Sequence, residues 1–194
     1  MVTALSALRK AAADCRACPL WKNAAQTVFG EGPADAVVML VGEQPGDQED
    51  KQGHPFVGPA GRVLDEALAD AGIPRDRTYV TNAVKHFKWK ARGKRRIHDK
   101  PNWSEVAACH PWLEGEVAAV QPKAIVALGA TAARAVVGRT VAITRERGQP
   151  LESDLAPVVV ATFHPSAVLR AQDRRDEMQA ALTDDLRVVA QHLQ

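Results

Sequence analysis

The chain has 194 residues, of which 46% are hydrophobic and 25% are charged, a composition that can bury a core and excludes an intrinsically disordered protein. The length fits one domain, and no apolar run approaches the roughly 20 residues that a membrane-spanning helix needs. The formal net charge is only +2, but the charges are unevenly distributed along the chain.

The N-terminal segment MVTALSALRKAAADCRACPL lacks the pattern of a secretory signal, so we expect a cytoplasmic protein without a membrane partner. It contains Cys15 and Cys18, and the third and last cysteine is Cys109. In a cytoplasmic protein, a Cys-x-x-Cys pair plus one distant cysteine indicates metal or redox chemistry before structural disulfides. We therefore predict a metal-ligand segment at about 10–25.

Short apolar runs that are rich in β-branched residues predict four buried strands. These runs cover residues 36–42, 78–84, 124–129 and 156–165. Helical patterns lie between and after them. They cover residues 61–72, a helix that a capping box opens at Asn102 and that ends near residue 120, residues 131–138, and a last helix from Asp173 to about residue 192. Residues 43–60 read as a loop, and residues 141–153 as a β-ribbon or an irregular excursion.

Strands and helices alternate, and the strands are continuous apolar runs, which is typical of a sheet covered on both faces. We predict an α/β fold: three layers, α/β/α, around a central, mostly parallel four-stranded sheet, in a single domain over residues 1–194. Ligands bind such sheets beyond the C-terminal ends of the strands. Glu43, Gln44, Asn82 and His164 all stand at predicted strand ends, so the sequence predicts one site at this edge.

A basic block covers residues 85–100, where eight Lys and Arg residues face a single acid, Asp99. The rest of the chain holds 17 basic and 22 acidic residues, so the block stands on an otherwise acidic protein. Such a block indicates an anionic partner met at one place, most simply the phosphates of a nucleic acid. A merely solubilising loop is the alternative. Lys94, Arg95 and Arg96 are the candidate DNA contacts.

Several motifs, in this order, resemble the family 4 uracil-DNA glycosylases: GEQPGDQED…GHPFVGPAG, TNAVKH, VALGATA and TFHPSAVLR. The resemblance covers nearly the whole chain. It is nearest to the UdgX branch, which has GEQPG where other family 4 members have GEGPG, and which carries an inserted KRRIH loop. Here the insertion corresponds to a basic loop at about 88–101. The resemblance implies a DNA-repair enzyme that excises uracil from DNA and favours single strands. No assembly pattern is visible, and we expect a monomer.

Uracil excision needs a site that holds a flipped-out base and stabilises the anion that develops on it. The Asn82 amide offers the acceptor and donor that uracil N3–H and O4 require. The resemblance assigns base stacking to Phe56. His164 can donate a hydrogen bond to uracil O2 as charge builds there, and Gly42 is a further candidate for the uracil site. Ser166 is a candidate phosphate ligand. Arg170 is a further candidate for DNA contact.

In the UdgX branch, the histidine of KRRIH attacks C1′ after uracil departs and remains attached to the abasic sugar. His98 occupies that place, and Glu43 is suited to take its proton or orient its tautomer. Gln44 adds bulk that can exclude or position water. Asp47 is a supporting residue of the same motif, and Arg96 is also a candidate for fixing the loop in a closed position.

Two other functions remain open from the sequence. One is a turnover glycosylase in which water is the nucleophile and His98 only binds phosphate. The other is a non-catalytic protein that binds uracil-containing or single-stranded DNA through Phe56 and the basic loop.

The predicted metal ligands are Cys15, Cys18, Cys109 and His86. His86 stands in NAVKH where other family 4 members have NVVKC. The resemblance implies a structural [4Fe–4S] cluster held by three Cys and one His. Side-chain chemistry alone equally allows a Cys3His zinc site.

Overall fold

The computed structural model describes residues 4–193, so residues 1–3 and 194 of the predicted domain lie outside it. Its centre is a four-stranded sheet with strand order β2-β1-β5-β6. The strands are β1 (Val38–Gly42), β2 (Thr78–Asn82), β5 (Ala124–Leu128) and β6 (Val158–Thr162). Each neighbouring pair is parallel. The predicted fold class is therefore confirmed, and this sheet is parallel throughout.

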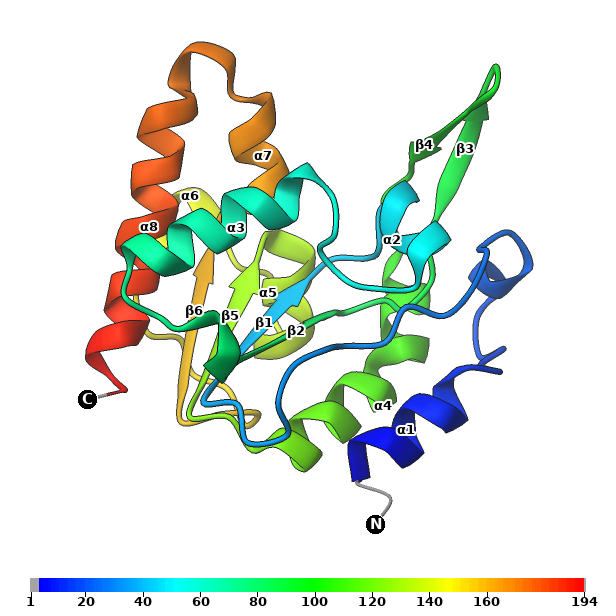
Figure 1. Cartoon of the computed structure of the whole chain (residues 1–194), viewed down its shortest axis with the longest axis horizontal. Coiled ribbons are helices and arrows are strands. Elements are labelled where there is room, and N and C mark those ends of the chain that lie inside the picture. The colour runs from blue at the N-terminus through cyan, green and yellow to red at the C-terminus, as the bar shows by residue number, and fades with distance from the viewer. Residues whose placement is uncertain (1–3, 194) are drawn as a thin grey trace.

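Helices cover both faces of the sheet, which gives the three layers (Figure 1). Alternate residues of β1 belong to different cores: Val38 and Leu40 to one, Met39 and Val41 to the other. The first core is completed by α3 (Pro59–Asp70), α7 (Pro165–Arg170) and α8 (Arg175–Gln191). The second is completed by α1 (Ala4–Ala12), α4 (Trp103–Val120) and α5 (Ala130–Val137). Since both faces are buried, the strands lack a polar alternation.

The long helices follow the predicted patterns closely. The capping box at Asn102 opens α4, with its side chain accepting the N–H of Glu105 and the Glu105 carboxylate accepting the N–H of Asn102. Val106, Cys109 and their successors at helical spacing are buried. Ala107 is exposed, because it lies one residue off that stripe.

The helices α1, α7, α2 (Asp47–Gln52) and α6 (Ile143–Glu146) were not predicted. The loop after β1 contains α2, and the region predicted as a β-ribbon or an irregular excursion contains α6. Three 3-10 turns also appear: η1 (Pro19–Lys22), η2 (Arg75–Arg77) and η3 (Gln172–Arg174). Among the described residues, no helix is long and apolar enough to cross a membrane.

The basic loop is an antiparallel hairpin rather than an irregular loop. Its strands are β3 (Trp89–Arg92) and β4 (Arg95–His98), and Arg92 pairs with Arg95. The turn consists of two residues, Gly93 and Lys94. The φ of 60° at Gly93 suits a tight hairpin turn. The hairpin projects from the body of the molecule above α2 (Figure 1). We call residues 89–98 the basic hairpin.

Candidate active site

A cavity of about 640 Å³ opens where the parallel strands end. Most of the predicted catalytic, uracil-binding and DNA-binding residues line it together. They are Glu43, Gln44, Phe56, Asn82, His98, His164, Ser166 and Arg170. These residues come from distant parts of the chain and meet because the C-terminal ends of parallel strands share one edge. Lys100 and Thr131, which were not predicted as site residues, also line the cavity.

One wall of the cavity depends on the absence of a side chain at Gly42, the last residue of β1. Gly42 pairs in register with Asn82 of β2. A Cβ atom on Gly42 would lie 2.3 Å from Asn82 Oδ1 and 2.8 Å from Phe56 Cζ. Only glycine therefore allows the amide and the ring to approach each other here. Asn82 is 3% exposed, so its side chain is enclosed by the protein rather than free in solvent.

Phe56 adopts a left-handed backbone conformation, with φ of 56°, which is rare for a residue with a bulky side chain. Gly61 on α3 permits this turn, because a Cβ there would lie only 1.7 Å from the Phe56 carbonyl oxygen. The Phe56 ring stacks on His164, with 6.1 Å between ring centroids and 27° between ring planes. A left-handed residue that other parts of the fold hold in place is typical of a functional loop.

The tautomer of His164 follows from its contacts with Ser166. The Ser166 backbone N–H donates to His164 Nδ1 over 3.1 Å, so Nδ1 carries no proton in the neutral ring. The proton is then on Nε2, which is free to donate toward a base. Burial lowers the pKa of His164 to about 4; the Glu43 carboxylate opposes this shift and Arg170 adds to it. His164 is therefore a neutral hydrogen-bond donor at neutral pH.

Glu43 and His98 form a pair at the mouth of the cavity. His98 Nε2 lies 3.3 Å from Glu43 Oε1, and the His98 side chain is half exposed. Burial raises the pKa of Glu43, but hydrogen bonds from His98 and Thr131 outweigh burial and hold this pKa below its ordinary value. Glu43 is therefore a carboxylate at neutral pH, able to orient the imidazole or accept a proton from it.

Gln44 fastens the base of the basic hairpin. Its Nε2 donates to the carbonyl oxygens of Lys88 and Asp99, over 3.0 and 3.1 Å, and its Oε1 accepts the Lys88 N–H over 3.1 Å. The side chain thus joins the two chain segments that flank the hairpin. Because its amide is bound to backbone on both sides, its contacts favour a role in holding the hairpin over the predicted role in positioning water.

Arg96 fastens the hairpin to α2. Its guanidinium binds Asp47 Oδ1 and Asp50 Oδ2, each over 2.6 Å, and it stacks on the rings of Phe87 and Trp89. These contacts tie the hairpin to α2, as a role of Arg96 in fixing the loop would require, and they occupy the groups that a phosphate would need. Asp50 was missed in the sequence; its only signal was its position one helical turn after Asp47.

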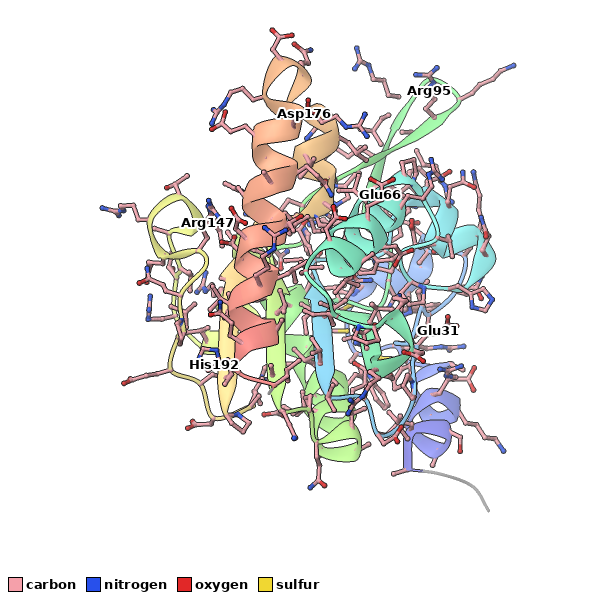
Figure 2. The ribbon with its side chains drawn as sticks, turned by 60° about the vertical axis from the view of Figure 1, so that its left-hand side comes forward. Glu31, Glu66, Arg95, Arg147, Asp176 and His192 are labelled. Carbon is pink, nitrogen blue, oxygen red and sulfur yellow. The ribbon has the colours of Figure 1, made fainter. Side chains whose placement is uncertain are left out.

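The other two predicted DNA contacts lie at the free end of the hairpin. Lys94 and Arg95 are both exposed, and Arg95 marks the outer end of the hairpin in Figure 2. Among the described residues, neither forms a salt bridge. Their charges are therefore available to a polyanion.

The three cysteines are free thiols that influence one another's ionisation. Burial raises the pKa of the Cys109 thiol to about 11, and the Lys85 charge opposes this shift. Burial also raises the pKa of Cys18. Cys109 Sγ accepts the Lys85 N–H, and Cys15 Sγ accepts the Trp112 indole N–H, both over 3.2 Å. N–H groups directed at sulfur stabilise thiolate ligands, so these two contacts, unlike the raised thiol pKa values, are compatible with the chemistry of a sulfur-bound metal centre.

His86, the predicted fourth ligand, is 4% exposed and follows directly after Lys85. Burial lowers its pKa, which favours the neutral form that a metal requires. Its Nε2 lies 3.0 Å from Thr27 Oγ1. Within residues 4–193, however, no group of three or more His, Cys, Asp and Glu side chains is arranged to hold a metal ion.

The family model of the uracil DNA glycosylase superfamily matches residues 29–187. The chain belongs to that superfamily. The match includes every residue that lines the cavity and leaves out Cys15 and Cys18.

Members of the uracil-DNA glycosylase superfamily are also found among the individual proteins that the chain resembles. The Type-4 uracil-DNA glycosylase of Thermotoga maritima is 41% identical over 173 residues, which cover 89% of this chain and 85% of that protein. The Type-4 uracil-DNA glycosylase of Pyrobaculum aerophilum is 37% identical over 185 residues, 92% of this chain and 91% of that protein. A Type-5 uracil-DNA glycosylase of the same organism is 33% identical over 162 residues, 75% of this chain and 68% of that protein.

Proposed function

We propose that the protein excises uracil from DNA, preferentially from single strands, and then becomes covalently attached to the abasic sugar through His98, as the UdgX branch does. The observation that carries this proposal is the Glu43–His98 pair, 3.3 Å apart, in the same cavity as Phe56 and Asn82. A carboxylate and an imidazole beside a base-binding wall provide both a nucleophile and an acceptor for its proton.

Base recognition would use the wall built around Gly42. Uracil stacks on Phe56, and the Asn82 amide pairs with uracil N3–H and O4. His164 Nε2–H donates to uracil O2, where negative charge develops as the base departs. Because Ser166 fixes the tautomer of His164, this donor is in place before the reaction begins, which is the arrangement that stabilises a transition state most effectively.

The covalent step begins when the glycosidic bond breaks and its electron pair leaves with uracil N1. A ring nitrogen of neutral His98 then donates its lone pair to C1′ and forms the new N–C bond. Glu43 accepts the proton that the imidazole must lose, and the uracil anion takes a proton from solvent. Lys94 and Arg95 hold the DNA phosphates while Gln44 and Arg96 hold the hairpin that carries His98.

The decisive experiment uses an end-labelled single-stranded oligonucleotide with one uracil, incubated with the protein and resolved on a denaturing gel. We expect a band at the combined mass of protein and DNA, absent when thymine replaces uracil. In His98→Ser the band disappears, while uracil release continues because base departure does not need His98. A free abasic product without the band would instead support a turnover glycosylase. Binding without any product would support a non-catalytic DNA-binding protein.

For the metal centre we propose a [4Fe–4S] cluster bound by Cys15, Cys18, Cys109 and His86, with zinc as the alternative. The chemistry it supplies is structural: a set of strong bonds between the N-terminal segment, the end of β2 and α4. Metal analysis of the purified protein distinguishes iron and sulfide from zinc. Unchanged metal content in His86→Ala would remove His86 from the ligand set. The cytoplasmic location and the monomeric state also stay predictions.

A further inference from the structure

Lys85 is a charged residue in the interior of the protein. It is 0% exposed and stands three residues after Asn82. Its ammonium donates to Glu116 Oε2 over 2.6 Å, to Thr81 Oγ1 over 2.6 Å and to the Asn82 carbonyl oxygen over 2.7 Å. An ammonium has three N–H groups, and each has an acceptor here.

Glu116, on α4, is equally buried and equally well bound. Its carboxylate accepts the Gly30 backbone N–H over 2.9 Å and the Tyr79 hydroxyl over 3.0 Å, besides the Thr81 hydroxyl. It is thereby fixed to β2 and to the segment before β1, and it in turn fixes Lys85. Buried ion pairs are a poor way to gain stability, since an apolar pair of similar volume often serves as well. Stability alone therefore does not account for this network.

The network acts on the backbone at the end of β2, where the Asn82 side chain faces Gly42 and Phe56. We infer that Lys85 is a positioning residue for base recognition: paired with Glu116, it holds the Asn82 carbonyl and so sets the direction of the Asn82 amide. The inference rests on the proposed role of Asn82. The competing account is that the strand ladder alone holds Asn82, through bonds such as Ala83 N–H to the Gly42 carbonyl over 2.8 Å.

The variant Lys85→Met/Glu116→Gln separates the two accounts. It removes both charges together, and the glutamine retains an acceptor for Gly30 and Tyr79. Two non-reacting oligonucleotides serve as ligands: one with a 2′-fluorinated deoxyuridine, whose fluorine resists glycosidic cleavage, and one with a tetrahydrofuran in place of the nucleoside. The ratio of their dissociation constants measures recognition of the base alone.

We expect the double variant to weaken binding of the uracil oligonucleotide by about tenfold, the scale of one charge-assisted hydrogen bond, and to leave binding of the tetrahydrofuran oligonucleotide unchanged. In an Asn82→Ala background, the same two substitutions should cause no further loss, because residues that act through one another are not additive. Tyr79→Phe is the matched control: it removes one bond to Glu116, leaves all three acceptors of Lys85, and should bind like the parent.

Equal losses on both oligonucleotides, additive losses with Asn82→Ala, or no loss at all would each overturn the inference. If the double variant does not fold, Thr81→Val tests the same point, since it removes one acceptor of Lys85 and should weaken only uracil binding. Failure of the proposed function looks different: the unmodified protein would then bind the two oligonucleotides equally.

Discussion

At the end of β1, the absence of a side chain at Gly42 makes room for the proposed base-binding wall. The Cβ atom introduced by Gly42→Ala would clash with both the Asn82 amide and the Phe56 ring. We expect uracil release to fall by about 100-fold, the scale of a displacement of roughly 1 Å in a reacting group. Single-turnover release of uracil measures this.

Gly115→Ala is the matched control for that substitution. Gly115 lies in α4, and a Cβ there meets only the end of the flexible Leu8 side chain, at 3.1 Å. We expect normal uracil release and a similar melting temperature. If Gly42→Ala released uracil as fast as this control, the close approach at Gly42 would not matter for catalysis.

The depressed pKa of His164 predicts how stability depends on pH. Its folded pKa is about 4 and its ordinary value is 6.5, so the unfolded chain binds more protons between these values. Stability due to this residue is therefore present above pH 6.5 and is lost as the pH falls toward 4, by up to about 1.4 kcal/mol per pH unit. Urea unfolding at pH 7 and pH 5 should show a smaller difference in His164→Gln than in the parent. Identical differences would contradict the assignment.

Among the elements, the basic hairpin places two residues with different roles on one face of the same strand. Arg96 and His98 are two residues apart on β4, so they share one face. Arg96 contacts α2 from that face, while His98 reaches Glu43. The position of Arg96, which anchors the hairpin, and the position of His98, which we propose to react, are therefore both determined by the short strand β4.

Loosening the base of the hairpin should slow covalent attachment more than it slows uracil release. Gln44→Ala removes three hydrogen bonds, each contributing about 1 kcal/mol, from the segments that flank the hairpin. We expect the rate of covalent attachment to fall 10- to 100-fold and uracil release to fall much less. Both rates come from the same denaturing gel. Arg96→Gln should act in the same direction, and equal losses in both steps would assign Gln44 to excision instead.

The two charges at the tip of the hairpin should contribute to the salt dependence of DNA binding. Each phosphate contact on a single strand contributes about 0.7 to the slope of log affinity against log salt concentration. Lys94→Ala/Arg95→Ala should therefore reduce the slope by about 1.4. Arg187→Ala on α8, which removes an exposed arginine paired with Asp184, is the control and should leave the slope unchanged. An unchanged slope in the double variant would remove the tip from the DNA interface.

The elements that were predicted from the sequence carry a local pattern of apolar residues. Elements whose formation depends on contacts with distant residues were missed. The strand β1 and the helix α4 carry their own patterns of apolar residues and a capping box. The hairpin and α2 hold each other through Arg96 and Asp50, a pairing that no local pattern displays. Gln44 is the same case at the site, because its partners are backbone atoms about 44 and 55 residues away.

For the whole molecule, the proposed metal centre predicts that replacing the single thiol of Cys109 lowers the stability of the entire fold. Cys109→Ser changes sulfur to oxygen with little change of shape, but it removes the proposed ligand that would connect α4 to the N-terminal segment. We expect loss of bound metal, a melting temperature lower by several degrees, and new proteolytic cleavage between residues 13 and 30. Metal analysis and limited proteolysis measure these outcomes, and full metal content in Cys109→Ser would contradict the ligand assignment.

The strand order also bears on how the protein is made. Strand β1 lies between β2 and β5, and the cavity is closed by His164, Ser166 and Arg170, which emerge late from the ribosome. A nascent chain therefore exposes its basic hairpin well before it possesses a complete cavity, and such long-range parallel pairing forms slowly. During synthesis the chain can meet polyanions, including the ribosomal RNA beside it, without yet being able to hold a base.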